Sequence, residues 1–445
     1  ANIQTDVIGA TSNLANYDWT SDNRTVTFIE KVYYTITAEV GTDGGGTVSG
    51  GGDVLVGGHT TLVATANDGY AFDGWYDGDT KLCSTKRFTV ENVTAAKTYT
   101  ARFKEKIHRT SKLFSTDYDA TLLSKAVDGG LVDDKTTIKA VSFVDINEYD
   151  LTEAVTVDYS ADNDGSVLAW YDNANSELYI GGYEKIIAGS SLAYAFYYGH
   201  SIEAINGLDL LDTSNVTSMS HMFDSALNGM YSELKLGDNF DTSNVTDMSG
   251  MFNRCGHSTG FKLDLGSNFD TSKVTNMSYM FCECGEYSDT FALNLGDKFN
   301  TTYVRDMSHM FAYCGRYSEN FTLDLGSGFD TSRVEYMSFM FAYCGQNGGN
   351  FTLNLGDKFN TTYVMNMSDM FDSCGQASDK FKLDLGNKFD TSSVTDMSHM
   401  FAYCGQESGN FTLNLGDNFD TYSVTDMSNM FNSCGSKSSA FTTLD

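Results

Sequence analysis

Cysteine has the most regular chemical pattern in this chain. Seven of the nine cysteines recur at one position of a repeated sequence, and the first copy of the repeat has Ala226 there. They are Cys255, Cys284, Cys314, Cys344, Cys374, Cys404 and Cys434. A row that accepts alanine is expected to be small and buried, and neighbouring copies would lie within the Cα separation of a disulfide, roughly 4.4–6.8 Å. The odd number favours buried free thiols over a zipper of disulfides, and no C-x-x-C or Cys/His zinc spacing occurs.

Histidine and aspartate could supply acid–base chemistry, but both follow the repeat. His221, His309 and His399 share one position and lie three copies apart, too far to act together. Paired carboxylates that cleave polysaccharides would break the repeat at one place, whereas these aspartates recur in register. No Ser-His-Asp set, phosphate-binding glycine loop or metal motif stands out. The sequence therefore predicts no enzymatic activity, no catalytic or metal-binding residue and no cofactor.

The residue between the two leucines of an F-x-L-x-L motif alternates between carboxylate and amide. The row reads Asp264, Asn294, Asp324, Asn354, Asp384 and Asn414. Two full charges ~5 Å apart repel by about 0.8 kcal/mol even in water, so the alternation would relieve repulsion along a stack. Duplication of a two-copy unit explains the alternation equally well. A calcium ladder is disfavoured by the alternation and by the lack of a nonapeptide G-G-x-G-x-D signature.

A repeat that runs from Asp212 onward positions all these residues. The first methionine of its M-S-x-M-F core recurs about 29 residues apart for two steps and about 30 residues apart thereafter, at Met219, Met248, Met277, Met307, Met337, Met367, Met397 and Met427. A fixed period of this size is typical of a solenoid. F-x-L-x-L predicts a half-buried strand, whereas M-S-x-M fits either a bent strand or a short helical turn. The methionine, phenylalanine and leucine rows are predicted to form the core.

Four segments are expected along the chain. Residues 1–30 form a lead-in or the end of an upstream domain, with a strand-like run over 25–29. Residues 31–105 form a small all-β module with glycine-rich turns. Residues 106–206 are non-repetitive and are expected to cap the first coil as a mixed α/β flank, and residues 207–445 form the solenoid. The predicted fold class is therefore mainly β: a β-rich, leucine-rich-repeat-like solenoid of about eight coils with an N-terminal α/β cap and a small all-β module.

Composition restricts the partners. The net charge of −31 argues against nucleic acid, because phosphate recognition needs clustered lysine and arginine, and it argues equally against docking on anionic lipid. The sequence has no apolar run of about 18 residues, the length that would predict a membrane-spanning helix, so membrane insertion is not expected. The N-terminal ANIQTDVIGA lacks a signal-peptide pattern, and both ends are interpreted as those of a mature protein or a fragment.

Two parts of the chain resemble known families. Residues 240–255, FDTSNVTDMSGMFNRC, carry F-D-T-S-x-V-T-x-M-S-x-M-F-x-x-C, which resembles the BspA-like leucine-rich-repeat surface proteins. These coils are longer than the usual pattern and contain an insert such as GQNGGNF. The G-Y-x-F-x-G-W-Y core at residues 69–76 resembles a divergent internalin-type B-repeat, with Trp75 expected in its core. The resemblance implies an extracellular bacterial protein, secreted or attached to the cell wall, of a type often proposed to mediate adhesion.

We therefore expect an interaction protein, an adhesin that binds a protein or glycan ligand on host or neighbouring cells through one face. Tyrosine is favoured at binding surfaces because it is large and amphipathic. The candidate binding residues are the tyrosines of the variable rows, Tyr303, Tyr313, Tyr343, Tyr363 and Tyr403. They could instead only cover the flank of the solenoid. The alternative function is a structural stalk or filament subunit that self-associates.

Overall fold

The computed structural model describes residues 17–21, 26–41, 45–296, 298–379 and 381–439. The chain divides into two compact units, residues 1–107 with 147–152 and residues 108–146 with 153–445. Both are mainly β, and α1 (Leu122–Asp128) is the one α-helix among the described residues.

The first unit contains a hairpin and a β module. β1 (Tyr17–Ser21) and β2 (Val26–Glu30) pair antiparallel, and β2 overlaps the strand predicted over 25–29; Thr25 itself lies outside the described residues. The strands of the module are β3 (Tyr33–Val40), β4 (Gly46–Gly50), β5 (Gly52–Leu55), β6 (Thr60–Ala66), β7 (Tyr70–Asp77), β8 (Thr80–Cys83), β9 (Arg87–Val90) and β10 (Lys97–Glu105). They form a five-stranded sheet, β5-β3-β10-β7-β8, and a three-stranded sheet, β4-β6-β9.

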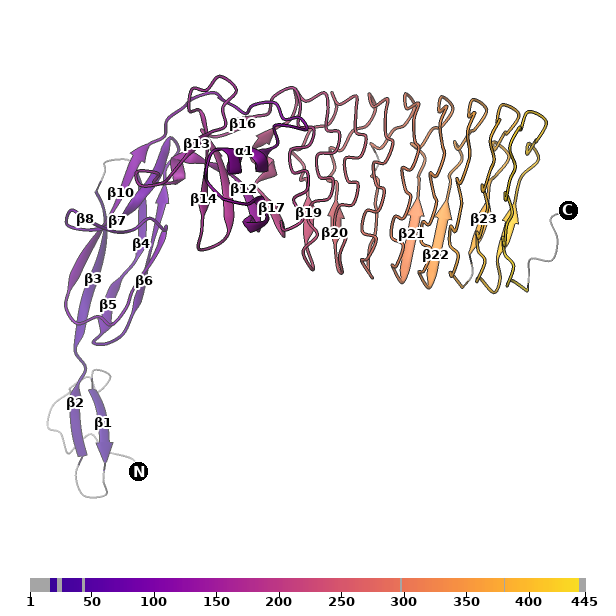
Figure 1. Ribbon diagram of the computed structural model, residues 1–445. Helices are drawn as coiled ribbons and strands as arrows, with labels where there is room; N and C mark the ends of the chain where they lie inside the picture. The colour runs from indigo at the N-terminus through magenta and orange to yellow at the C-terminus, as the bar shows by residue number, and fades with distance from the viewer. Residues whose placement is uncertain (1–16, 22–25, 42–44, 297, 380, 440–445) are drawn as a thin grey trace. The chain divides into compact units, whose positions relative to one another are not determined.

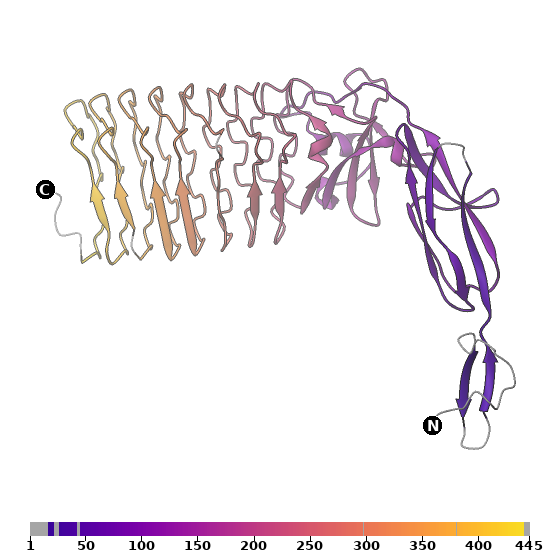
Figure 2. The ribbon, with the colours of Figure 1, turned by 180° about the vertical axis from the view of Figure 1, so that it is seen from behind.

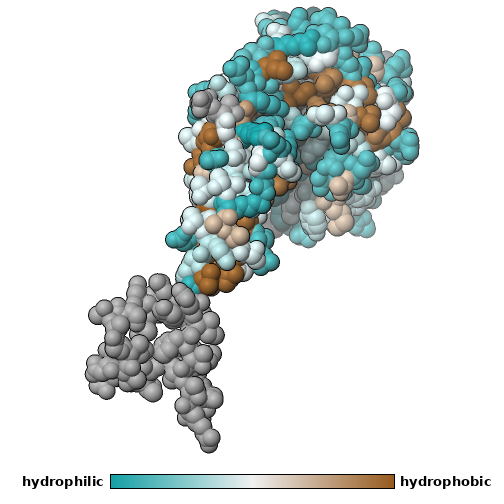
Figure 3. Space-filling model, turned by 90° about the vertical axis from the view of Figure 1, so that its left-hand side faces the viewer, coloured by the Kyte–Doolittle hydropathy of each residue, from teal (hydrophilic) through white to brown (hydrophobic). Residues whose placement is uncertain are grey.

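The core of the module is built around one tryptophan. Trp75 is fully buried, and its ring lies against Phe72 and Phe88, which confirms the prediction that it packs in the core. Figure 3 shows hydrophilic and hydrophobic side chains mixed on the surface of the module. The consecutive residues Leu55 and Val56 are among its exposed hydrophobic residues.

The second unit begins with a mixed α/β region. Its elements are β11 (Ser111–Lys112), α1, the 3-10 helix η3 (Lys135–Thr137), β12 (Ala140–Asp145), β13 (Val157–Asp158), β14 (Val167–Asp172), β15 (Glu177–Gly182), β16 (Ile186–Ile187), β17 (Ala204–Asn206), the 3-10 helix η5 (Leu208–Leu210) and β18 (Leu211–Asp212). A further 3-10 helix, η4 (Ile146–Glu148), lies where the two units meet in the sequence. Thr121 and Ser124 cap α1 reciprocally, which satisfies backbone donors that a helix start leaves free.

The repeats follow this region as a row of copies in parallel register (Figures 1 and 2). Bridges join the residue before each first methionine to its equivalent in the next copy, from Ser218 with Asp247 to Asp396 with Asp426. Short strands pair beside them: β19 (Glu233–Lys235) with β20 (Lys262–Asp264), β21 (Asn320–Asp324) with β22 (Asn350–Asn354), and β23 (Lys382–Asp384) with β24 (Thr412–Asn414). Most methionine, phenylalanine and leucine rows are buried, as the sequence predicts.

The M-S-x-M-F segment is a series of tight turns. In the fourth copy His309, Tyr313 and Gly315 all have left-handed backbone, with φ of 60°, 58° and 55°. Amides alternate in direction: Met310 N donates to Met307 O within the copy (3.1 Å), and Phe311 N donates to Met340 O of the next copy (2.9 Å). The segment is therefore neither a bent strand nor a helical turn, because left-handed residues send alternate amides to the neighbouring copy.

The repeat also begins earlier than its sequence pattern indicates. In residues 191–199, Tyr194 and Tyr198 have the left-handed φ of the later copies. Phe196 N donates to Met222 O (2.9 Å), and the Phe196 ring stacks on Phe223. The prediction that residues 106–206 hold no repeat is wrong at this point. Leucine and alanine stand in the methionine rows there and conceal the motif.

The strand ladder is interrupted between β20 and β21, where the period changes, and again between β22 and β23, where it does not. β19 and β20 pair residues 29 apart, whereas β21 and β22 pair residues 30 apart. The third copy has one more residue between Gly285 and Phe291 than the second copy has before Phe261. No described residue between β20 and β21 belongs to a strand, although the equivalent Phe261 and Phe291 still stack there.

Candidate functional site

Two of the predicted tyrosines lie on the outer side of neighbouring turns. Tyr313 and Tyr343 stack with their ring centroids 4.4 Å apart. Arg316 lies over both rings, 5.2 Å from the Tyr313 centroid and 5.7 Å from that of Tyr343. Tyr403 shares their row two copies later and contacts Asn432. Tyr313 and Tyr343 are half-buried, so their rings largely cover each other and the flank of the stack.

Tyr303 and Tyr363 lie elsewhere, on the row before the conserved valine, and they are more exposed. Their exposed fractions are 52 % and 65 %. Arg333 occupies the same row between them, with its guanidinium carbon 5.1 Å from the Tyr303 ring centroid. The row two residues later contributes Arg305, Glu335 and Met365, with Arg305 paired to Glu335. We call these six residues the Tyr/Arg patch.

The patch surrounds a surface depression of about 560 Å³ lined by Arg305, Arg333, Glu335, Tyr363 and Met365. Copies four to six alone lack the threonine that follows the same valine in the other copies, for example in the S-x-V-T of copies two, three and seven. Among the described residues, Arg333 is the one arginine of the repeat region for which no carboxylate partner is found. Sequence reasoning found the tyrosines but missed Arg305, Arg333 and Met365. The loss of the threonine after the valine was the signal for Arg305 and Met365.

A charge network lies across copies two to four. Arg254 donates to both carboxylate oxygens of Glu283 (3.0 and 3.2 Å), and buried Glu286 accepts from Arg316 (3.1 Å) and contacts His257. Burial alone would raise the pKa of Glu286, but the hydrogen bonds from His257 and Arg316 outweigh it, so that pKa lies below its usual value.

The ligand atoms of His257, Glu283 and Glu286 lie within 4.8 Å of one another, close enough to hold a metal ion. Two arginines already neutralise the two carboxylates. A divalent cation would have to displace them or accept their repulsion. The arrangement is therefore better explained as an ion-pair network that fastens three copies together.

The three equivalent histidines stay apart, as the sequence predicts. His221 Nδ1 forms a hydrogen bond with Asp224 Oδ2 (2.7 Å), His309 stacks between Tyr279 and Phe339, and His399 contacts Asn429. Burial lowers the pKa of His309. None of these contacts joins one histidine of the row to another.

The cysteine row is buried and unbridged among the described residues. Burial raises the pKa of Cys255, Cys314 and Cys374 well above the ordinary thiol value. A buried protonated thiol is a poor nucleophile and behaves as a small apolar side chain.

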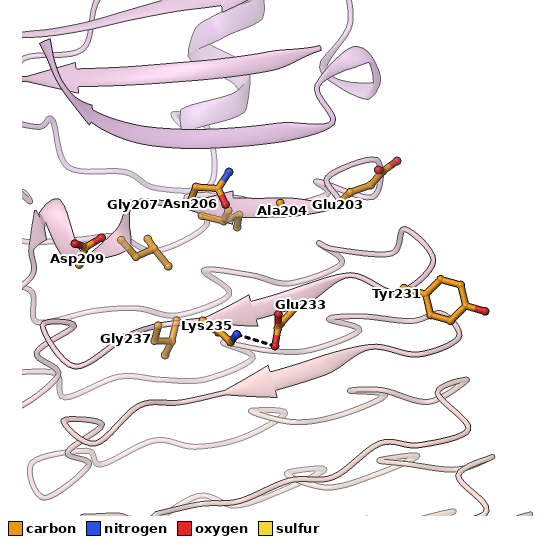
Figure 4. Close-up of a pocket in the computed structure, with 12 residues that line it drawn as sticks. Glu203, Ala204, Asn206, Gly207, Asp209, Tyr231, Glu233, Lys235 and Gly237 are labelled. Atoms are coloured by element: carbon orange, nitrogen blue, oxygen red, sulfur yellow. Dashed lines mark ion pairs between the residues drawn. The ribbon is translucent and has the colours of Figure 1, made fainter. Parts of the chain in front are cut away.

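A second depression lies between β17 and β19 and is shown in Figure 4. Its volume is about 590 Å³, and it is lined by residues 203–209 together with Tyr231, Glu233 and residues 235–237. The two strands pair only at Ala204 with Glu233, because left-handed Gly207 (φ 71°) turns the chain away one position earlier than Gly237 does in the next copy. We call this depression the β17–β19 cleft.

Family comparison identifies both parts of the chain. The model described as "Mycoplasma protein of unknown function, DUF285" matches residues 190–322, 257–381, 286–412 and 317–443, which together cover more than half of the chain. The chain belongs to the DUF285 family. The match starts at residue 190, in agreement with the repeat-like segment 191–199 of the structure. The model described as "Divergent InlB B-repeat domain" matches residues 34–107, which confirms that resemblance.

The two matches together indicate a bacterial surface repeat protein. The searches of curated proteins and of solved structures give no match. No described helix of this DUF285 protein is long and apolar enough to cross a membrane.

Proposed function

We propose that this DUF285 protein is an adhesin, secreted or attached to the bacterial cell wall, that binds protein or glycan ligands of host or neighbouring cells. In this proposal the repeats form a BspA-like, leucine-rich-repeat-like solenoid of about eight coils with an α/β cap. The chain carries out no catalytic step, binds no nucleic acid and does not insert into a membrane.

The Tyr/Arg patch is the observation that supports this function. Exposed tyrosine, methionine and arginine are the side chains enriched in protein interfaces. Other tyrosines of the repeats are exposed as well, but here tyrosine, methionine and arginine gather around one depression on three successive copies. Tyr303 and Tyr363 stand two copies apart, about 10 Å at the usual strand spacing, so one ligand can reach both. The stacked Tyr313 and Tyr343, and Tyr403, would contribute at the edge of the contact.

The test is binding of the whole chain to arrays of glycans and host extracellular proteins. The double variant Tyr303→Ala/Tyr363→Ala is compared with Tyr287→Ala/Tyr422→Ala, which removes two other exposed tyrosines. Loss of a bound ligand in the first variant alone supports the adhesin. No ligand on any array, together with end-to-end multimers in light scattering, would instead support the stalk or filament function.

A further inference from the structure

The β17–β19 cleft combines an apolar floor with an acidic rim. Buried Ile205, Leu208 and Leu236 form the floor. Glu203, Asp209 and Glu233 stand around it (Figure 4). The one cation that lines the cleft is Lys235, and Glu233 already pairs with it at 3.1 Å. Two carboxylates therefore remain above an apolar surface.

The sheet is open at this place. β12 and β17 pair over three residues, and β19 and β20 pair over three residues, but β17 and β19 pair at one. Beyond Ala204 the facing strands diverge and the cleft separates them. An extended peptide that enters such a gap can pair its backbone with an exposed strand edge, as in β-strand addition.

The charges around the cleft favour a positively charged ligand. A further depression of about 490 Å³ adjoins the cleft and shares Lys235 and Gly237 with it. Its lining adds two carboxylates, Asp238 and Asp264, and one further cation, Lys298. The whole chain carries −31, so its long-range field attracts cations. A negatively charged segment would be repelled both at a distance and at the rim.

We infer that the β17–β19 cleft binds an extended polypeptide segment rich in lysine or arginine, which lies alongside β19 and places apolar residues on the floor. The exposed ring of Tyr231, with 72 % of its surface free, stands at the entrance of the cleft and is available to stack on a guanidinium or cover an ammonium group. This inference uses a different surface from the proposed adhesin function and does not depend on it.

The probe is a short labelled peptide that alternates lysine and valine, with a glutamate–valine peptide of the same length for comparison. The variant Glu203→Gln/Asp209→Asn is compared with Asp357→Asn/Asp417→Asn, which removes the same two charges from exposed turns of the fifth and seventh copies. We expect the cleft variant to weaken binding of the lysine peptide about tenfold and the control to weaken it less than twofold. On binding, amide exchange should slow at residues 204–206 and 233–236.

Equal weakening by both variants would mean attraction to the net charge alone and would overturn the inference. Equal binding of the glutamate peptide would overturn the assigned chemistry. Slower amide exchange in strands of other copies would show that the cleft is not the binding site. A dimer that the peptide does not dissociate would show that a second copy of the chain occupies the cleft.

Discussion

At the scale of residues, each position of the repeat is set by its neighbours above and below. Asn354 Nδ2 donates to Asp324 Oδ1 (3.1 Å), and Asn414 Nδ2 donates to Asp384 Oδ1 (3.0 Å). The alternation of carboxylate and amide is therefore a hydrogen-bonded pairing as well as a relief of charge repulsion. Where a row breaks its pattern, the local electrostatics change.

Asp369 is such a break, because it places a carboxyl in the half-buried row of His309 and Phe339. Burial raises its pKa from 3.8 to about 6, near Asp372, Asp396 and His399. A carboxyl whose pKa is raised by folding destabilises the fold above that pKa, and the penalty disappears as the pH falls towards the unfolded value. Asp369→Asn should therefore stabilise the protein by about 1 kcal/mol at pH 7.5, a shift discounted for partial exposure, and by almost nothing at pH 4.

Urea unfolding at the two pH values measures this effect. Asp426→Asn is the control, because hydrogen bonds from Ser428 lower the pKa of Asp426, and its loss should destabilise at pH 7.5. A stabilisation by Asp369→Asn that is the same at both pH values would contradict the assigned cause.

The cysteine row gives a second prediction at this scale. If the thiols are free, all nine react with a thiol reagent in denaturant without reductant, and the fully buried ones stay protected in the native protein. Cys314→Ala should cost about 1 kcal/mol, since Ala226 occupies the same row, whereas Cys314→Ser buries a hydroxyl and should cost more. Fewer than nine reactive thiols in denaturant would indicate disulfides instead.

At the scale of elements, the left-handed turns are what sequence patterns did not reveal. Glycine follows the cysteine in seven copies, and in the fifth copy a Cβ on Gly345 would lie 2.3 Å from the Phe351 ring. Gly345→Ala should cost about 3 kcal/mol, from left-handed strain and overpacking together. Gly326→Ala is the matched control: its φ is 70° but nothing lies within 4 Å of the new Cβ, so only the strain remains. Equal losses in chemical denaturation would show that the Phe351 contact is unimportant.

The strand, the buried rows and the core tryptophan could be predicted from the sequence because each leaves a period or an apolar cluster. The turns of M-S-x-M-F could not, since Tyr313 and Phe339 are not residues that favour positive φ, and inter-copy hydrogen bonds impose it. In the candidate site, Tyr303 and Tyr363 stood out as tyrosines in variable rows. Arg333 could be recognised as part of the site only from the structure, which places it between Tyr303 and Tyr363 on neighbouring copies.

At the scale of the whole molecule, the stack is quasi-one-dimensional, so its stability is a sum of copies and nearest-neighbour interfaces. Removing whole copies should therefore leave a folded protein. Because carboxylate and amide alternate, removing one copy should differ from removing two. Deletion of residues 330–359 brings Asp324 beside Asp384. Deletion of residues 330–389 brings Asp324 beside Asn414 and keeps the amide–carboxylate pairing. The shorter deletion should consequently be the more damaging at the new junction, by about 1 kcal/mol from repulsion and a further ~1 kcal/mol from the lost hydrogen bond.

Urea unfolding at pH 7 at low and high salt tests this difference on both deletions. The shorter deletion should gain stability when salt screens the carboxylates or when Asp384→Asn restores an amide at the junction, and the longer deletion should respond to neither. If the two deletions lose stability only in proportion to the number of copies removed, and salt affects them equally, the alternation is an inherited mark of duplication with no energetic role. A difference between removing one copy and removing two would show that the functional length of the stack changes most readily in steps of two copies.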